Sequence, residues 1–364
     1  MRTSRQHTAD APPAPRTART PGRTRRRATP HAGARCYIFL RMRRFAPSLP
    51  TLAWITLAAN LVVILQGAVV RITHSGAGCG RHWPLCNGEV IPLAPTLETS
   101  IEFGHRLLSL VVLILGTWLL VKAFRARRDM PGTFAFATAS FVFLLIEALL
   151  GALTVLWGLT ADNVSVARGL MVASHLVNSM LLVGALSGTV WYATGRGVWP
   201  LRVRHQGVLG TTLAVAGVGM LVLMFSGGIA AMGNTMFPSA SLAEGLAADF
   251  DPDSHPLVRL RILHPLIAVM VGTYLFVSLG FGWWLKPAPE ARGPARALLG
   301  TYLANLAIGT FNLALLAPVV LQLLHLGVSV AAFGLLTITS VAMLGSATRT
   351  RVAGPVRGAT WENA

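Results

Sequence analysis

Charged side chains are scarce in this sequence: Asp, Glu, Lys and Arg make up only 12% of its 364 residues. A soluble domain carries about 25% charged residues. With 53% hydrophobic residues, too little polar surface is left to cover a globule in water. The hydrophobic residues form long runs near the length that crosses the core of a bilayer. The composition therefore excludes a soluble globular protein and predicts a membrane protein.

Acidic residues are also few, 13 against 31 Lys and Arg, and the formal net charge is +18. Much of this charge lies in residues 1–44, which hold twelve arginines and one acid. This segment has no hydrophobic periodicity, so residues 1–48 are predicted to form a disordered basic tail rather than a nucleic-acid-binding domain. Met42 begins a short basic lead before the first hydrophobic run, as a natural start does, and is an alternative first residue.

Only three cysteines are present, and Cys36 lies in the basic tail. Cys79 and Cys86 enclose six residues in the first loop predicted to face outward, where disulfides persist. A disulfide between them is our main interpretation. His82 lies between them, so free or metal-bound thiols are the alternative, although this spacing is no known zinc motif.

Eight hydrophobic stretches are predicted to be helices, because backbone groups in lipid must hydrogen-bond within their own segment. They cover residues 52–70, 101–121, 133–157, 169–193, 207–231, 260–285, 297–320 and 323–347. Pro318 predicts a tight hairpin between the last two. The predicted fold is an all-α, polytopic membrane protein with eight transmembrane helices.

Basic residues are unevenly distributed among the predicted loops, and basic loops face the cytoplasm. The loops after the second, fourth and sixth spans are rich in Lys and Arg. The loop after the fifth span instead carries Glu244, Asp249, Asp251 and Asp253. Both termini are therefore predicted to lie in the cytoplasm, with the odd-numbered loops outside.

The last four spans repeat features of the first four. Leu150–Thr154 in the third span matches Ile308–Asn312 in the seventh. Each half has an even number of spans, so the repeats share one orientation and a pseudo-two-fold axis along the membrane normal. The predicted parts after the tail are an N-terminal four-helix half (49–194), a C-terminal four-helix half (195–348) and a cytoplasmic tail (349–364).

Four of the ten histidines lie in the predicted spans, one in each even-numbered span: His105, His175, His264 and His325. Each lies within about two turns of the predicted start of its helix, so the four share a similar depth. Ionisable groups inside membranes are rare and usually functional. Two histidines from two helices in each half suit a planar macrocycle such as haem. The alternative is a hydrogen bond across a helix interface.

Three charged residues near these histidines have open roles. Glu102 and His105 share one helix face, so Glu102 is either a proton-exchanging carboxylate beside a metal ligand or an acid favoured by the helix dipole. Arg106 pairs with Glu102 or with a haem propionate, or extends to the membrane interface. Glu147, in the middle of the third span, is protonated, pairs across the bundle or faces a cavity.

The first loop and the second span together resemble the haem A synthase family, and the resemblance covers residues 50–347. It rests on the segments Gly67–Gly76, Cys79–Gly88, Glu102–Arg106, the segment around Gly151, and Asn234–Pro238. The loop motif combined with Glu-x-x-His-Arg is the most specific part.

The resemblance implies an enzyme that oxidises the C8 methyl group of haem O to a formyl group, giving haem A for cytochrome oxidase. Carried over by position, His105 and His175 hold the substrate haem, and His264 and His325 ligate a haem b cofactor. Glu102 is the implied catalytic carboxylate. The implied partners are haem O synthase, cytochrome oxidase assembly factors and an electron donor in a bacterial cell membrane, with no nucleic acid.

The sequence departs from the family pattern at two places. Some relatives carry a second cysteine pair after the fifth span, whereas residues 232–258 contain no cysteine, so no second disulfide is predicted. Glu147 occupies a position where relatives often have glutamine.

Two other functions compete with this one. A di-haem electron-transfer protein typically places two histidines on one helix, whereas each helix here offers one. A haem transporter or chaperone needs the histidines but has little use for Glu102.

Overall fold

The computed structural model describes residues 47–201, 207–285 and 288–349. The predicted basic tail with the alternative start at Met42, and the predicted C-terminal tail, lie almost entirely outside these ranges. Within these ranges the regular elements are helices and no strand is present; a single isolated β-bridge joins Cys86 and Glu89.

Eight helices of the described chain are long and apolar enough to cross a membrane, which confirms the predicted all-α fold. They are α2 (Leu49–Ile72), α3 (Leu97–Arg125), α4 (Pro131–Leu156), α5 (Val166–Ala193), α6 (Val208–Met236), α9 (Leu263–Leu285), α10 (Pro289–Ala314) and α11 (Val319–Arg349). Shorter helices lie in the loops: η1 (Ser75–Ala77), α7 (Leu242–Phe250), α8 (Pro256–Arg259) and η3 (Leu260–Ile262).

Polar caps start two of the spanning helices earlier than the hydrophobic pattern predicts. The side chain of Thr96 accepts a hydrogen bond from the backbone N–H of Thr99 at the start of α3, and Ser165 does the same for Arg168 at the start of α5. Such caps satisfy backbone donors that have no partner inside the helix. Because hydropathy does not register this polar first turn, the predicted starts at residues 101 and 169 are late.

The hairpin between α10 and α11 lies where Pro318 predicts it, but α10 ends at Ala314, earlier than predicted. Leu316 and Ala317 have φ angles of 58° and 57°, outside the helical region. A residue that precedes proline is sterically disfavoured in the helical conformation. The hydrophobic run continues past the end of the helix, so hydropathy alone places this boundary too late.

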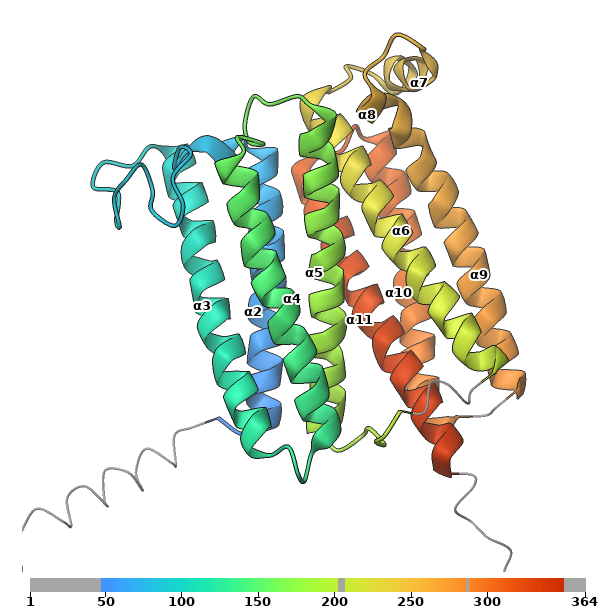
Figure 1. Ribbon diagram of the computed structural model, residues 1–364. Helices are drawn as coiled ribbons and strands as arrows, with labels where there is room; N and C mark the ends of the chain where they lie inside the picture. The colour runs from blue at the N-terminus through green and yellow to red at the C-terminus, as the bar shows by residue number, and fades with distance from the viewer. Residues whose placement is uncertain (1–46, 202–206, 286–287, 350–364) are drawn as a thin grey trace, which may run out of the picture. The chain divides into compact units, whose positions relative to one another are not determined.

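The same order of helix neighbours occurs twice along the chain. Among the first four spanning helices, α2 packs on α3 and α5, and α4 packs on α3 and α5. Among the last four, α6 packs on α9 and α11, and α10 packs on α9 and α11. Figure 1 shows the two sets next to each other, and α5 joins them through contacts with α6 and α11. This central place explains why the part of α5 from Asn178 to Ala193 is buried.

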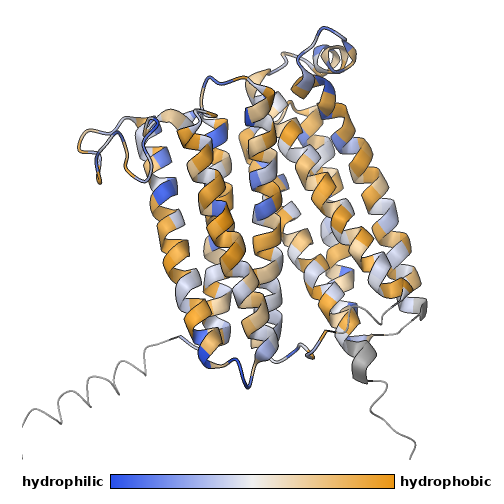
Figure 2. Cartoon of the chain, viewed as in Figure 1, coloured by the Kyte–Doolittle hydropathy of each residue, from blue (hydrophilic) through white to orange (hydrophobic). Residues whose placement is uncertain are grey.

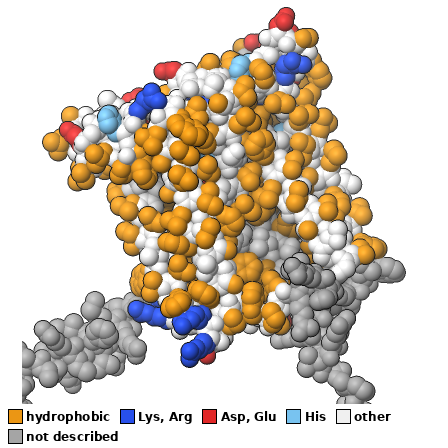
Figure 3. Space-filling model, viewed as in Figure 1, with side chains coloured by type: hydrophobic (Ala, Val, Ile, Leu, Met, Phe, Trp, Pro, Cys, Tyr) orange, Lys and Arg blue, Asp and Glu red, His pale blue; other side chains and the backbone are white. Residues whose placement is uncertain are grey.

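Hydrophobic residues predominate along the spanning helices, whereas hydrophilic residues are most frequent toward the two ends and occur at a few positions in between (Figure 2). The first loop, α7 and α8 lie at one end, which we call the loop end; α2 begins and α11 finishes at the opposite end (Figure 1). In Figure 3, Lys and Arg side chains form a patch at that opposite end, where α3 joins α4. Lys122 and Arg125 of the last turn of α3 belong to it.

Candidate functional site

Each of the four membrane histidines lies against a glycine of the preceding spanning helix. The pairs are Gly67–His105, Gly151–His175, Gly227–His264 and Gly309–His325. A Cβ atom on Gly227 or Gly309 would lie 2.9 Å from Cε1 of the facing imidazole, and one on Gly67 would lie 3.1 Å from it. A side chain at any of these three positions would force the imidazole to move. The sequence analysis matched the glycines of α4 and α10 as a repeat, but it did not predict that any of the four glycines faces a histidine.

His264 and His325 lie close enough to share a metal ion. Their ring centroids are 6.2 Å apart and their planes are perpendicular. A metal ion bound between two imidazoles through bonds of about 2 Å holds the ring centroids roughly 6 Å apart. Both rings are partly buried, and their spacing therefore fits the two axial positions of a haem iron.

Neither Nε2 atom of this pair makes a hydrogen bond within the described structure. The hydroxyl oxygen of Ser226 lies 3.1 Å from Nδ1 of His264, the kind of contact that orients a ligating imidazole. Nδ1 of His325 is buried without a hydrogen-bond partner among the described residues. In the described ranges no group of three or more His, Cys, Asp or Glu side chains is arranged to hold a metal ion.

In the first half, His175 makes a contact that His325 does not make in the second. Its Nε2 lies 3.1 Å from Oε1 of Glu147 on α4, and Asn178 and Ser179 of α5 donate to the same carboxylate. Glu147 thus pairs across the bundle, as one of the predicted alternatives has it. If His175 ligates a metal through Nε2, it must first give up this contact.

A polar contact in the second half corresponds to that of Glu147, and the sequence analysis missed it. Asn305 precedes Gly309 by four residues, as Glu147 precedes Gly151. Its amide donates to the hydroxyl of Ser329, 2.8 Å away. Ser329 follows His325 by four residues, as Ser179, the partner of Glu147, follows His175. The shared offset from the glycine is the sequence feature by which this correspondence can be found.

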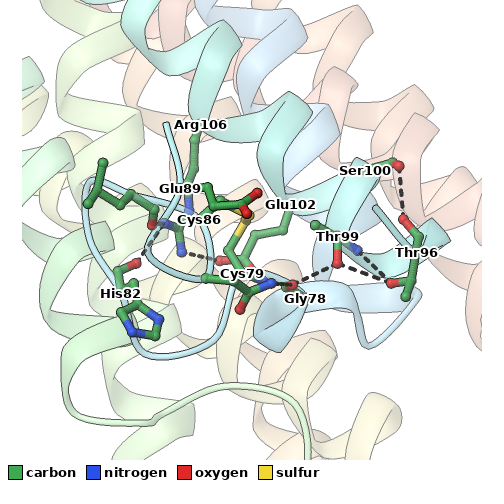
Figure 4. The surroundings of a disulfide bond; sticks show 12 residues. Gly78, Cys79, His82, Cys86, Glu89, Thr96, Thr99, Ser100, Glu102 and Arg106 are labelled. Atoms are coloured by element: carbon green, nitrogen blue, oxygen red, sulfur yellow. Dashed lines mark hydrogen bonds and ion pairs between the residues drawn. A yellow bond between two sulfur atoms is a disulfide. The ribbon is translucent and has the colours of Figure 1, made fainter. Parts of the chain in front are cut away.

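Glu102 is buried, and both of its carboxylate oxygens have partners in the described structure. Oε2 accepts a hydrogen bond of 2.8 Å from the backbone N–H of Cys79, and Oε1 pairs with Arg106. The ion pair confirms the pairing with Glu102 among the predicted alternatives for Arg106. Arg106 also donates to the carbonyl oxygens of His82 and Leu85. Figure 4 shows how the carboxylate lies under the first loop. This position suits a proton-exchanging group, and it equally anchors the loop.

A disulfide joins Cys79 and Cys86, with an S–S distance of 2.01 Å. This confirms our main interpretation over the alternative of metal-bound thiols. The loop is also tied to α3 by Thr99, whose hydroxyl donates to the carbonyl of Gly78 at 2.7 Å. The disulfide and the polar contacts together hold the loop on the start of α3.

Replacing both Cys79 and Cys86 by serine is expected to lower the free energy of unfolding by a few kcal/mol at most, because a short closed loop restricts the unfolded chain little. The backbone donor to Glu102 remains in this variant. Thermal unfolding in detergent measures the change. Alkylation mapping that finds both thiols free in untreated membranes would contradict the disulfide itself.

The four histidines occupy even-numbered spans as predicted, but two of them lie farther from the helix start than expected. His105 and His175 are in the third turn of α3 and α5, because those helices begin early, whereas His264 is in the first turn of α9. Glu102 lies one turn before His105 on α3.

Comparison with known proteins agrees with this arrangement. The family model described as cytochrome oxidase assembly protein matches residues 50–339. A Thermus thermophilus protein named protoheme IX farnesyltransferase is 47% identical over 278 residues, which are 75% of this chain and 45% of that protein. A heme A synthase of Bacillus mycoides is 48% identical over 107 residues, 29% of this chain and 34% of that protein.

The match to the family model includes all four membrane histidines, Glu102 and both cysteines of the first loop. This chain spans less than half the length of each of these relatives. The family model nevertheless covers most of the chain, and eight of its helices are long and apolar enough to cross a membrane. The chain is an integral membrane protein that belongs to the haem A synthase family of cytochrome oxidase assembly proteins.

Proposed function

We propose that this protein oxidises the C8 methyl group of haem O to a formyl group and so produces haem A. The observation that carries the proposal is a repeated arrangement in which each half has two histidines that face glycines of the preceding helices; we call these the first (His105, His175) and the second (His264, His325) histidine pocket. In the described chain a buried carboxylate, Glu102, lies one turn from a histidine of the first pocket alone. Two equal pockets would suit simple electron transfer, whereas this difference suits one reacting haem and one electron-carrying haem.

In this proposal the first pocket holds the substrate. His105 and His175 bind haem O between α3 and α5, and Gly67 and Gly151 leave room for their rings. Glu147 holds the unliganded His175 in place through its contact with Nε2. Oxidation of the methyl group to a formyl group removes four electrons from the carbon. Two hydroxylations balance this change: each uses one dioxygen, two protons and two electrons from the electron donor, places one oxygen atom on the carbon and releases the other as water. The twice-hydroxylated carbon then loses water to give the formyl group.

The second pocket holds the cofactor. His264 and His325 ligate haem b, and their centroid separation of 6.2 Å fits this role. When bound, haem b supplies one-electron transfer. Ser226 orients the imidazole of His264 through Nδ1.

An alanine substitution at Gly309 of α10 tests whether His325 is a haem ligand in the second histidine pocket. In Gly309→Ala the new Cβ would lie 2.9 Å from Cε1 of His325, so the imidazole must move. We expect loss of the bis-imidazole absorption spectrum while the helix is retained, since alanine favours helix over glycine by up to about 1 kcal/mol.

Gly300→Ala is the matched control on the same helix, because its Cβ would meet nothing within 4 Å. It should keep the wild-type spectrum. A wild-type spectrum in Gly309→Ala as well would contradict the assignment of His325 as a ligand.

Glu102 is the group that exchanges protons near the reacting haem. Its carboxylate lies at the loop end of α3, between the N–H of Cys79 and the guanidinium of Arg106. A positioned carboxylate of this kind contributes roughly a hundredfold or more to a proton-coupled step.

The loop end faces outward in this proposal. Lys122, Arg125, Arg127 and Arg128 lie where α3 joins α4, at the opposite end, which the distribution of basic residues assigns to the cytoplasm. The resemblance to a protein named protoheme IX farnesyltransferase supports a partnership with the enzyme that makes haem O.

Expression in a bacterial strain that makes haem O and no haem A tests the function. We expect haem A among the extracted haems only when the protein is present. If the protein accumulates in the membrane with bound haem b and the strain still yields only haem O, the chain is an electron-transfer protein or a haem carrier instead.

A further inference from the structure

Arg71, in the last turn of α2, carries a positive charge that no carboxylate balances. Its Nη1 donates to the carbonyl oxygen of Ala231 (3.1 Å) and to the hydroxyl of Thr235 on α6, and its Nη2 donates to the side-chain carbonyl of Gln322 on α11 (2.9 Å). All three acceptors are neutral. Among the described residues no carboxylate lies within ion-pair distance of Arg71, and the charged residue that acts on it, Arg168, repels it.

The guanidinium still has donors to offer. It has five N–H groups in a planar fork, and three of them are used by the neutral acceptors. Nε–H and the second Nη2–H have no partner in the described part of the chain. Nε and Nη2 lie on one edge of the guanidinium, and a carboxylate can pair with such an edge through two parallel hydrogen bonds.

The guanidinium contacts α6 and α11, the two helices that carry Gly227 and His325 of the second histidine pocket. Ala231 lies one turn beyond Gly227, the glycine that faces His264. Gln322 lies one turn before His325 on α11. Ala231 and Gln322 are therefore both nearer than Gly227 and His325 to the loop end, where α6 ends and α11 begins (Figure 1). The guanidinium is therefore about one helical pitch, roughly 5 Å, from the level of the imidazoles.

We propose that Arg71 binds a propionate carboxylate of the haem held between His264 and His325. This inference rests on the haem b site of the proposed function. It makes the N-terminal half of the chain supply an anion-binding residue to the ligand of the C-terminal half. The carboxylate supplies the negative charge that Arg71 lacks, and its two oxygens match the open edge of the guanidinium.

Haem b and its dimethyl ester, in which both carboxylates are blocked, test the proposal. The full-length protein is prepared without haem and titrated with each porphyrin, and the bis-imidazole absorption band reports binding. We expect wild type to bind the free acid about tenfold more tightly than the ester, the effect of one charged hydrogen-bonded pair. In Arg71→Gln the ratio of the two affinities should fall close to one. Arg71→Lys keeps the charge and loses the planar fork of donors, so its ratio should lie between those of wild type and Arg71→Gln.

Arg81→Gln is the matched control. Arg81 lies in the first loop and donates to the carbonyl of Leu156, away from the partners of Arg71, so its loss should leave the preference unchanged. The same preference in Arg71→Gln as in wild type would overturn the proposal. Equal affinity of wild type for the two porphyrins would overturn it without any variant. A wild type that gives no bis-imidazole spectrum would overturn the haem b site and the role of Arg71 with it.

Discussion

Glu102→Gln is expected to lower the formation of haem A by at least about a hundredfold while haem b content and the amount of protein in the membrane stay normal. Glutamine has the size of glutamate and can still accept the hydrogen bond from the N–H of Cys79. It cannot exchange a proton, and its amide offers only one acceptor where the carboxylate offers two. Haem O or a partly oxidised haem should accumulate. Extraction and chromatography of the haems measure the change.

A loss of activity in Glu102→Gln could also have a structural cause, because Glu102 holds the first loop on α3. Thr99→Val separates the two roles, since it removes the hydrogen bond from Thr99 to the carbonyl of Gly78 and leaves Glu102 untouched. If Glu102 acts chemically, Thr99→Val should keep most of the activity that Glu102→Gln loses. Equal losses in both variants would assign Glu102 to the loop, and full activity of Glu102→Gln would remove it from the mechanism.

His264→Ala and His325→Ala are expected to lose the bound haem b, with affinity lower by at least about tenfold. Each imidazole supplies one of two axial bonds, and the remaining ring cannot provide the second. His105→Ala and His175→Ala should retain most of the haem b, because their rings belong to the other pocket. The bis-imidazole spectrum of each purified variant, normalised to protein, gives the comparison.

This contrast tests the division of labour between the two halves. An equal loss of haem b in all four variants would mean that the pockets do not bind different haems. A loss confined to His105→Ala and His175→Ala would place the cofactor in the first half.

The spanning helices could be predicted from the sequence because a bilayer demands long runs of hydrophobic residues. The histidines could be singled out for the same reason, since a polar ring stands out in such a run. The disulfide followed from two cysteines in one short loop. The start of α3 could not be placed by hydropathy, because Thr96 and the polar turn after it contribute hydrogen bonds instead of hydrophobicity.

Contacts between helices could not be predicted in the same way. Several spanning helices, α6 and α9 among them, are hydrophobic nearly all round, so the pattern does not reveal how each is rotated. The contacts of Gly67 with His105 and of Gly227 with His264 therefore could not be predicted from the sequence. The hydrogen bond from the backbone N–H of Cys79 to Glu102 also comes from loop geometry that residue spacing does not encode, whereas the pairing of Glu102 with Arg106 is an i, i+4 contact on α3.

The most direct test of the account uses the purified protein, haem O, dioxygen and a reductant system, with the haems extracted and separated after incubation. The account predicts that haem O is converted to haem A, with partly oxidised haem as the only other product. Recovery of all the haem O unchanged, from protein that retains its bis-imidazole haem b, would contradict it.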